Sequence, residues 1–80
     1  MNYMKDLTMT IEKQLGMRIR FLRKQRNLSI EDLALEAGVN KNYLSDLERG
    51  QRNPSLKILS KIAVALKISI SELTKAIEEF

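Results

Sequence analysis

The segment KNYLSDLER, residues 41–49, combines an apolar side with a polar side of mixed chemistry. At 3.6 residues per turn, a helix places Leu44 and Leu47 on one side. The other side carries hydrogen-bond donors and acceptors of different shapes, which belong to Lys41, Asn42, Ser45 and Asp46. A helix side that only faces solvent needs charged groups, but it does not need donors and acceptors of different shapes. This helix is therefore a candidate for recognising the hydrogen-bonding pattern of another molecule.

The residue types that are missing limit the chemistry further. The 80-residue chain contains no cysteine and no histidine, which removes disulfides, thiolate metal sites and the commonest general base. The acidic residues Glu31, Asp32 and Glu36 lie along one predicted helix rather than around a cleft. We therefore expect no enzyme, no metal or cofactor, and no small-molecule ligand.

Charge is distributed unevenly along the chain, whose net charge is +4. Six cations and no acid lie within residues 13–26: Lys13, Arg18, Arg20, Arg23, Lys24 and Arg26. A basic helix is often only a solvated surface, but cations near a candidate recognition helix favour a polyanionic partner. The longest apolar run, Ile62–Leu66, is too short to span a membrane. We expect a cytoplasmic protein without a membrane partner.

Helical periodicity runs through the whole chain and predicts an all-α fold of five helices. Residues 1–10 are predicted to form an N-terminal arm, and residues 11–80 one small domain. The first helix is expected over residues 11–26, where Gly16 lowers the helix propensity by about 1 kcal/mol and loosens the first turn. Met17 and Phe21 lie on a separate side of that helix, expected to pack under the arm or, as the alternative, to form a dimer contact.

Capping signals delimit the remaining helices. The predicted N-caps are Ser29, Asn40, Ser55 and Ser69, with capping boxes completed by Asp32 and Glu72. Gly38 can adopt the left-handed conformation that ends a helix, and Gly50 ends the next one. Two helices joined by a short turn containing glycine form a helix-turn-helix motif, which favours DNA binding, although such pairs also occur in bundles that bind nothing.

Several segments together resemble the Cro- and lambda-repressor-like helix-turn-helix family, the Xre group. The similarity covers about residues 15–73 through LGMRIRFLRKQRNLS, EDLALEAGVNKNYLSDLERGQRNPSL and LKISISEL. The segment NYLSDLERGQRNPS also resembles controller proteins of restriction–modification systems. The resemblance implies a five-helix bundle whose third helix enters the major groove. It also implies a homodimer on a partly palindromic operator, with half-sites about 34 Å apart.

In that geometry the first turn of the third helix meets base edges. Lys41 can donate to guanine O6 and N7, and Asn42 can pair with adenine through two hydrogen bonds. Asp46 can accept from cytosine N4, or it can orient Lys41 or Asn42 instead. Ser45 either contacts a base or only lies close to the second helix.

The resemblance also implies residues that bind the DNA backbone without recognising sequence. By this resemblance Arg49, Arg52 and Asn53 are phosphate-binding candidates. Tyr43 is a further candidate by its position, and the helix starts at Ser29 and Ser55 can bind phosphate through their backbone N–H groups. Tyr43 can alternatively contact a thymine methyl group. Relatives usually begin the second helix with a glutamine that braces the first base-contacting residue. Ile30 stands there in this chain, so Lys41 is expected to be less constrained.

Two further contacts are expected within or between subunits. The resemblance implies a structural ion pair between Arg23 and Glu48. The last helix carries large apolar residues expected to form a homodimer interface, with part of them absorbed by the core: Ile70, Leu73, Ile77 and Phe80.

The expected function is a sequence-specific transcriptional regulator that binds double-stranded DNA as a homodimer and acts by occupancy. Control of restriction–modification genes is the narrower hypothesis. The alternative is an antitoxin-type protein-interaction module that binds a toxin partner and regulates its own gene. RNA binding is less favoured, because the four aromatic residues form no evident stacking cluster.

Overall fold

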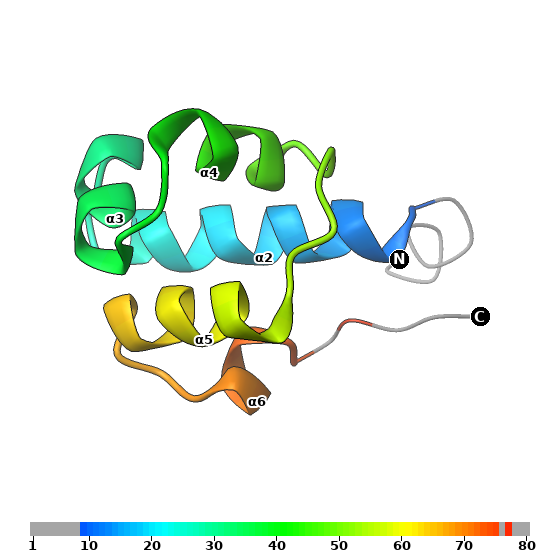
Figure 1. Ribbon diagram of the computed structural model, residues 1–80. Helices are drawn as coiled ribbons and strands as arrows, with labels where there is room; N and C mark the ends of the chain where they lie inside the picture. Colours follow the sequence, from blue (N-terminus) through cyan, green and yellow to red (C-terminus); the bar gives the residue numbers. More distant parts are fainter. Residues whose placement is uncertain (1–8, 76, 78–80) are drawn as a thin grey trace.

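The computed structural model describes residues 9–75 and 77, which form five helices and no strand (Figure 1). The helices are α2 (Ile11–Gln25), α3 (Ile30–Ala37), α4 (Lys41–Glu48), α5 (Leu56–Ala65) and α6 (Ile70–Leu73). The predicted all-α fold is confirmed. Of the predicted arm, only Met9 and Thr10 lie within the described residues, and the Thr10 side chain caps α2.

Local capping chemistry determines where the helices begin. The predicted caps Ser29, Asn40, Ser55 and Ser69 all accept hydrogen bonds from N–H groups of the following turn. The capping box of α3 is complete, and Gly38 ends this helix with a φ of 69°. At α6 the Ser69 hydroxyl accepts from the Glu72 N–H, whereas the Glu72 carboxylate binds Arg18.

One core holds the helices together, and every helix contributes to it. In Figure 1, α2 runs through the middle, with α4 on one side, α5 and α6 on the other, and α3 at the left end, where it contacts both α4 and α5. The largest fully buried side chains are Ile19, Leu33, Leu44, Leu47, Ile62 and Leu73. Burial of both α4 leucines anchors this helix, so its polar side faces outward. No helix within the described part of the chain is long and apolar enough to cross a membrane.

Gly16 has a packing role that the sequence prediction missed. Helix α2 passes the end of α4 so closely that a Cβ atom at residue 16 would lie 2.4 Å from the carbonyl oxygen of Glu48. Real side chains do not tolerate such a contact between a Cβ and a backbone atom. The glycine therefore permits the close contact between α2 and the end of α4.

Leu73 corrects the predicted dimer interface. Its side chain is fully buried in the core of its own subunit, so it has no surface to offer a second subunit. Because α6 ends at Leu73, Ile77 lies after this helix, although the sequence placed both residues on it. Ile70 and Ile77 are half-buried, while Phe80 lies outside the described residues.

Candidate nucleic-acid interface

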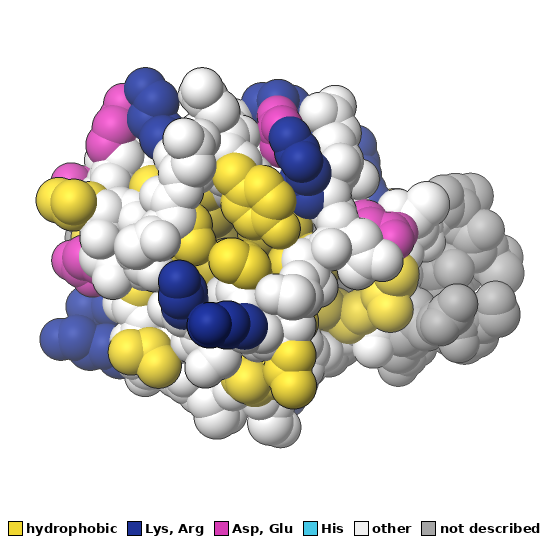
Figure 2. Space-filling view, viewed as in Figure 1, with side chains coloured by type: hydrophobic (Ala, Val, Ile, Leu, Met, Phe, Trp, Pro, Cys, Tyr) yellow, Lys and Arg dark blue, Asp and Glu magenta, His cyan; other side chains and the backbone are white. Residues whose placement is uncertain are grey.

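The first turn of α4 is fixed in place and exposed at its tip. The Asn40 side-chain oxygen accepts from the N–H groups of Asn42, at 2.7 Å, and Tyr43, at 3.1 Å. The side chains of Lys41 and Asn42 are exposed. Two of the four predicted base-contacting residues, Lys41 and Asn42, are therefore presented outward on a capped turn, whereas Ser45 and Asp46 are half-buried. Figure 2 shows basic and acidic side chains lying together along the edge formed by α3 and α4.

Lys41 is constrained by a residue that the sequence prediction did not assign to the interface. Its Nζ lies 3.4 Å from a carboxylate oxygen of Glu31, which belongs to the first turn of α3. The backbone N–H at the start of the helix and, next, the Lys41 amine lower the pKa of Glu31 below its usual range. Lys41 therefore has one partner, the acid that follows Ile30, while the expectation that it is less constrained than its counterpart in relatives stays a prediction.

Ser45 and Asp46 are bound to arginines that follow them. Arg49 donates to the Ser45 hydroxyl at 2.8 Å and to one Asp46 carboxylate oxygen. Arg52 donates to the other Asp46 oxygen at 3.2 and 3.3 Å. Asp46 therefore orients two predicted phosphate-binding arginines, and the suggestion that it orients Lys41 or Asn42 is wrong.

Tyr43 connects this cluster to the body of the domain. The Arg52 guanidinium lies over the Tyr43 ring, 5.3 Å from its centroid, while the ring is half-buried against the core. Beside it lies a hollow between α4 and α5, lined by Gly38, Val39, Asn40, Tyr43, Ser55 and Ile58. Figure 2 shows apolar side chains in a hollow between α4 and α5 and Lys or Arg side chains near α5. Two predicted phosphate-binding residues, Tyr43 and Ser55, thus line the same surface depression.

The two capping serines present helix starts toward solvent. The Ser29 and Ser55 hydroxyls accept from the N–H groups of Asp32 and Ile58, respectively. Each is exposed, and each retains a hydroxyl proton that can be donated to a phosphate. Lys57, in the first turn of α5, is an exposed cation that the sequence prediction left out. Its position two residues after a capping serine is a signal that could have identified it.

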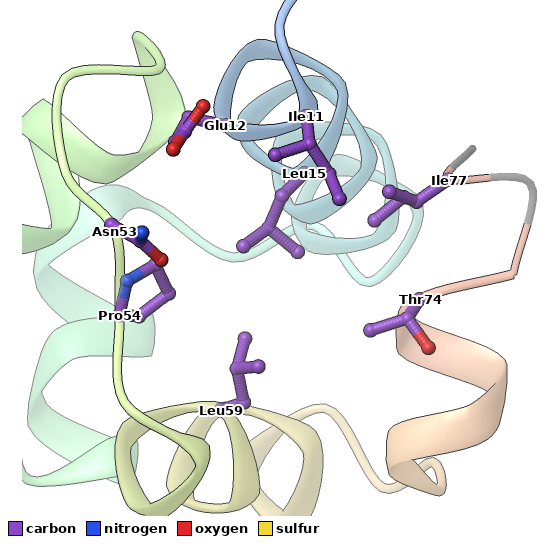
Figure 3. Close-up of a pocket in the computed structure, with 8 residues that line it drawn as sticks. All are labelled: Ile11, Glu12, Leu15, Asn53, Pro54, Leu59, Thr74 and Ile77. Carbon is purple, nitrogen blue, oxygen red and sulfur yellow. The ribbon is translucent and has the colours of Figure 1, made fainter. Parts of the chain in front are cut away.

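Asn53 lies apart from that hollow, at the edge of a second one (Figure 3). Figure 3 shows four apolar side chains directed toward this hollow from α2, α5 and the segment after α6: Ile11, Leu15, Leu59 and Ile77. Glu12, Asn53, Pro54 and Thr74 complete its wall. The predicted dimer residue Ile77 therefore continues into an apolar surface that also includes Ile11, which is 42% exposed.

Arg23 and Glu48 form the predicted ion pair inside the domain. Arg23 Nε and Nη2 donate to the two Glu48 carboxylate oxygens at 2.7 and 3.1 Å, and Nη1 donates to the Leu28 carbonyl oxygen. Both side chains are buried. The pair joins α2 to the end of α4 and thereby fixes the orientation of the candidate interface.

The basic run of α2 is partly structural. Arg18 binds Glu72, and Arg26 donates to the Ala65 carbonyl oxygen at 3.0 Å. Together with Arg23, three of the six cations thus make contacts within the subunit. Exposed Arg20 and Lys24 lie beside Met17 and Phe21, which are 48% and 54% exposed. This run is therefore weaker support for a polyanion partner than the sequence indicated.

Comparison with known proteins identifies relatives over most of the described chain. Residues 19–73 match the family model described as Helix-turn-helix. The HTH-type transcriptional regulator SlrR of Bacillus subtilis is 44% identical over 63 residues, which are 78% of this chain and 41% of SlrR. The chain spans roughly half the length of the first curated relatives that it matches.

Solved structures show the same similarity. The restriction-modification controller protein C.AhdI from Aeromonas hydrophila superposes with a TM-score of 0.76 at 44% identity, covering 78% of this chain and 94% of C.AhdI. The biofilm master regulator SinR, solved in complex with DNA, gives a TM-score of 0.71 at 42% identity, covering 74% and 95%. These relatives are regulators, in agreement with the expectation of a non-enzymatic domain.

Proposed function

This chain belongs to the helix-turn-helix family, and from that premise we propose that it binds a specific sequence in double-stranded DNA and regulates transcription in the cytoplasm. One observation carries the proposal: helix α4 is anchored by two buried leucines and exposes Lys41 and Asn42 at its tip. A rigid helix end with unlike donors and acceptors suits the major groove, where each base pair has a distinct hydrogen-bonding pattern.

Different residues would perform recognition and positioning. Asn42 pairs with an adenine and Lys41 with a guanine, and each good bidentate pair provides about 1–3 kcal/mol of discrimination between bases. Arg49 and Arg52 bind phosphates, and the exposed helix starts at Ser29 and Ser55 donate N–H groups to others. Because Asp46 already accepts from both arginines, its role is to orient them, and a contact with cytosine is secondary.

We further propose that the protein acts as a homodimer on a partly palindromic operator. The apolar hollow of Figure 3, which Ile11 and Ile77 help to line, provides an apolar surface on one side of the domain. An 80-residue chain has a small core, so burial of this surface between two subunits would stabilise both. Sedimentation of the Ile77→Glu variant tests the dimer, because this half-buried residue can be charged without opening the core, unlike Leu73.

We propose that the genes this protein regulates are those of a restriction–modification system. The similarity to C.AhdI supports it, since this chain covers nearly all of that controller protein. The supporting genetic observation would be a neighbouring pair of methyltransferase and nuclease genes. A neighbouring toxin gene would instead favour the antitoxin-type module, for which the exposed Met17 and Phe21 offer a protein-binding surface on α2.

Selection from a random pool of DNA duplexes tests DNA recognition. We expect a defined motif with related half-sites to be enriched, and we expect Asn42→Ala to lose preference at one position of each half-site. Gln25→Ala, an exposed amide at the end of α2, is the matched control and should keep the motif. Recovery of unrelated sequences by the wild-type protein would contradict the proposed function.

A further inference from the structure

Each cation of α4 and of the turn after it is paired with a carboxylate of the same chain. Lys41 is paired with Glu31, and Arg49 and Arg52 are paired with Asp46. These five side chains have a net charge of only +1. A surface that binds DNA through phosphates alone gains from unpaired cations, because phosphate contacts supply most of the affinity for any sequence.

Glu31 is the carboxylate of this set that pairs with the tip of α4. It comes from the neighbouring helix α3, ten residues before Lys41 in the sequence, and its carboxylate is 67% exposed. A lysine amine has three N–H donors. One donor directed at Glu31 leaves two, which is the number that guanine O6 and N7 accept.

We infer that Glu31 is a specificity-determining residue, which holds the Lys41 amine toward the bases and away from the phosphates of unrelated DNA. The inference rests on the proposed DNA-binding function and adds to it a carboxylate that is not itself required for affinity. In a complex with unrelated DNA, the freed Lys41 would reach a phosphate, and Glu31 opposes this both by pairing with the amine and by repelling the phosphate.

Loss of the Glu31 charge is therefore expected to change the affinity for unrelated DNA and the affinity for the cognate sequence by different factors. With unrelated DNA, the released amine adds one phosphate contact, which steepens the dependence of log affinity on log salt concentration by about 0.9. With the cognate sequence, Lys41 already binds a guanine, so the gain is smaller. The ratio of cognate to unrelated affinity must fall.

The matched variants Glu31→Gln and Glu36→Gln test the inference. Both remove one exposed negative charge from α3, but only Glu31 contacts Lys41 among the described ion pairs. Dissociation constants are measured by fluorescence anisotropy for the selected duplex and for a shuffled duplex of the same length, at several salt concentrations. For Glu31→Gln we expect the affinity ratio to fall by about fivefold or more, which corresponds to the lower end of the discrimination by one base pair contact.

For Glu36→Gln we expect both affinities to change by the same factor, so the ratio stays constant. Equal ratios for the two variants would overturn the inference. In a Lys41→Met background, Glu31→Gln should no longer change the ratio, and a persisting effect would equally overturn it. The failure of the proposed function gives a separate result, because wild-type protein would then bind the selected and shuffled duplexes alike.

Discussion

Replacing Glu48 by alanine tests the buried ion pair that joins α2 to α4. The side chains of Arg23 and Glu48 are only 8% and 4% exposed, and two hydrogen bonds connect them. Alanine would leave the Leu28 carbonyl oxygen as the acceptor that still binds this guanidinium. Because a buried charge is then only partly compensated, we expect the free energy of unfolding to fall by about 3–5 kcal/mol.

This loss is large for so short a chain. At roughly 0.05–0.15 kcal/mol per residue, a domain of 80 residues has a total stability of about 4–12 kcal/mol. Since 1 kcal/mol shifts Tm by about 4–8 °C in a domain of this size, the variant should melt at least about 12 °C below the wild type. The folded fraction should keep its DNA sequence preference, because Leu44 and Leu47 still anchor α4 in the core when the buried Glu48 is removed.

Urea unfolding followed by circular dichroism gives the free energy directly. The control is Glu36→Ala, an exposed acid whose removal should change stability by no more than about 0.5 kcal/mol. The double variant Arg23→Met, Glu48→Leu should regain much of the loss, since apolar residues can replace a buried pair. A Glu48→Ala stability within about 1 kcal/mol of wild type, at an unchanged m-value, would refute the reasoning.

Other positions give independent tests. Gly16→Ala should lower stability by about 1–3 kcal/mol in thermal melts despite its better helix propensity, because its Cβ would meet the Glu48 carbonyl oxygen. Arg52→Ala should weaken cognate and shuffled duplexes alike and flatten the salt dependence by about 0.9 in anisotropy titrations. Hydrogen bonds from the Ser29 N–H and hydroxyl lower the pKa of Asp32 below its ordinary 3.8. The Asp32 carboxylate therefore stabilises the folded protein fully above pH 3.8, and this stabilisation is lost as the pH falls below the lowered pKa. In melts at pH 2–5, Asp32→Asn should therefore differ from wild type less as the pH falls below 3.8; a constant difference would argue against the capping role.

Local chemistry made the helix ends predictable. Ser29 and Asn40 cap helices because their side chains can accept from N–H groups only two or three residues away, which any sequence window shows. Gly38 was recognisable for the same reason, since its left-handed conformation is a property of one residue. The α4 leucines followed from helical periodicity, and with them the outward direction of the candidate site.

Contacts between helices were less predictable, because they depend on how the helices cross. Glu31 and Lys41 are ten residues apart and meet only through the angle between α3 and α4. The packing role of Gly16 likewise depends on how closely α2 passes the end of α4. Leu73 shows the same limit, since periodicity marks a residue as apolar without indicating whether its own core or a second subunit covers it.

Amide chemical shifts of the ¹⁵N-labelled protein, titrated with the selected duplex, test the central claim most directly. We expect the largest changes at residues 40–46 and around Arg52 and Ser55, where the exposed side of α4 and the following helix start lie. Amides of α2 near the exposed Met17 and Phe21, which line a surface without α4 residues, should change little. The largest changes on that surface of α2, with α4 unaffected, would contradict the account.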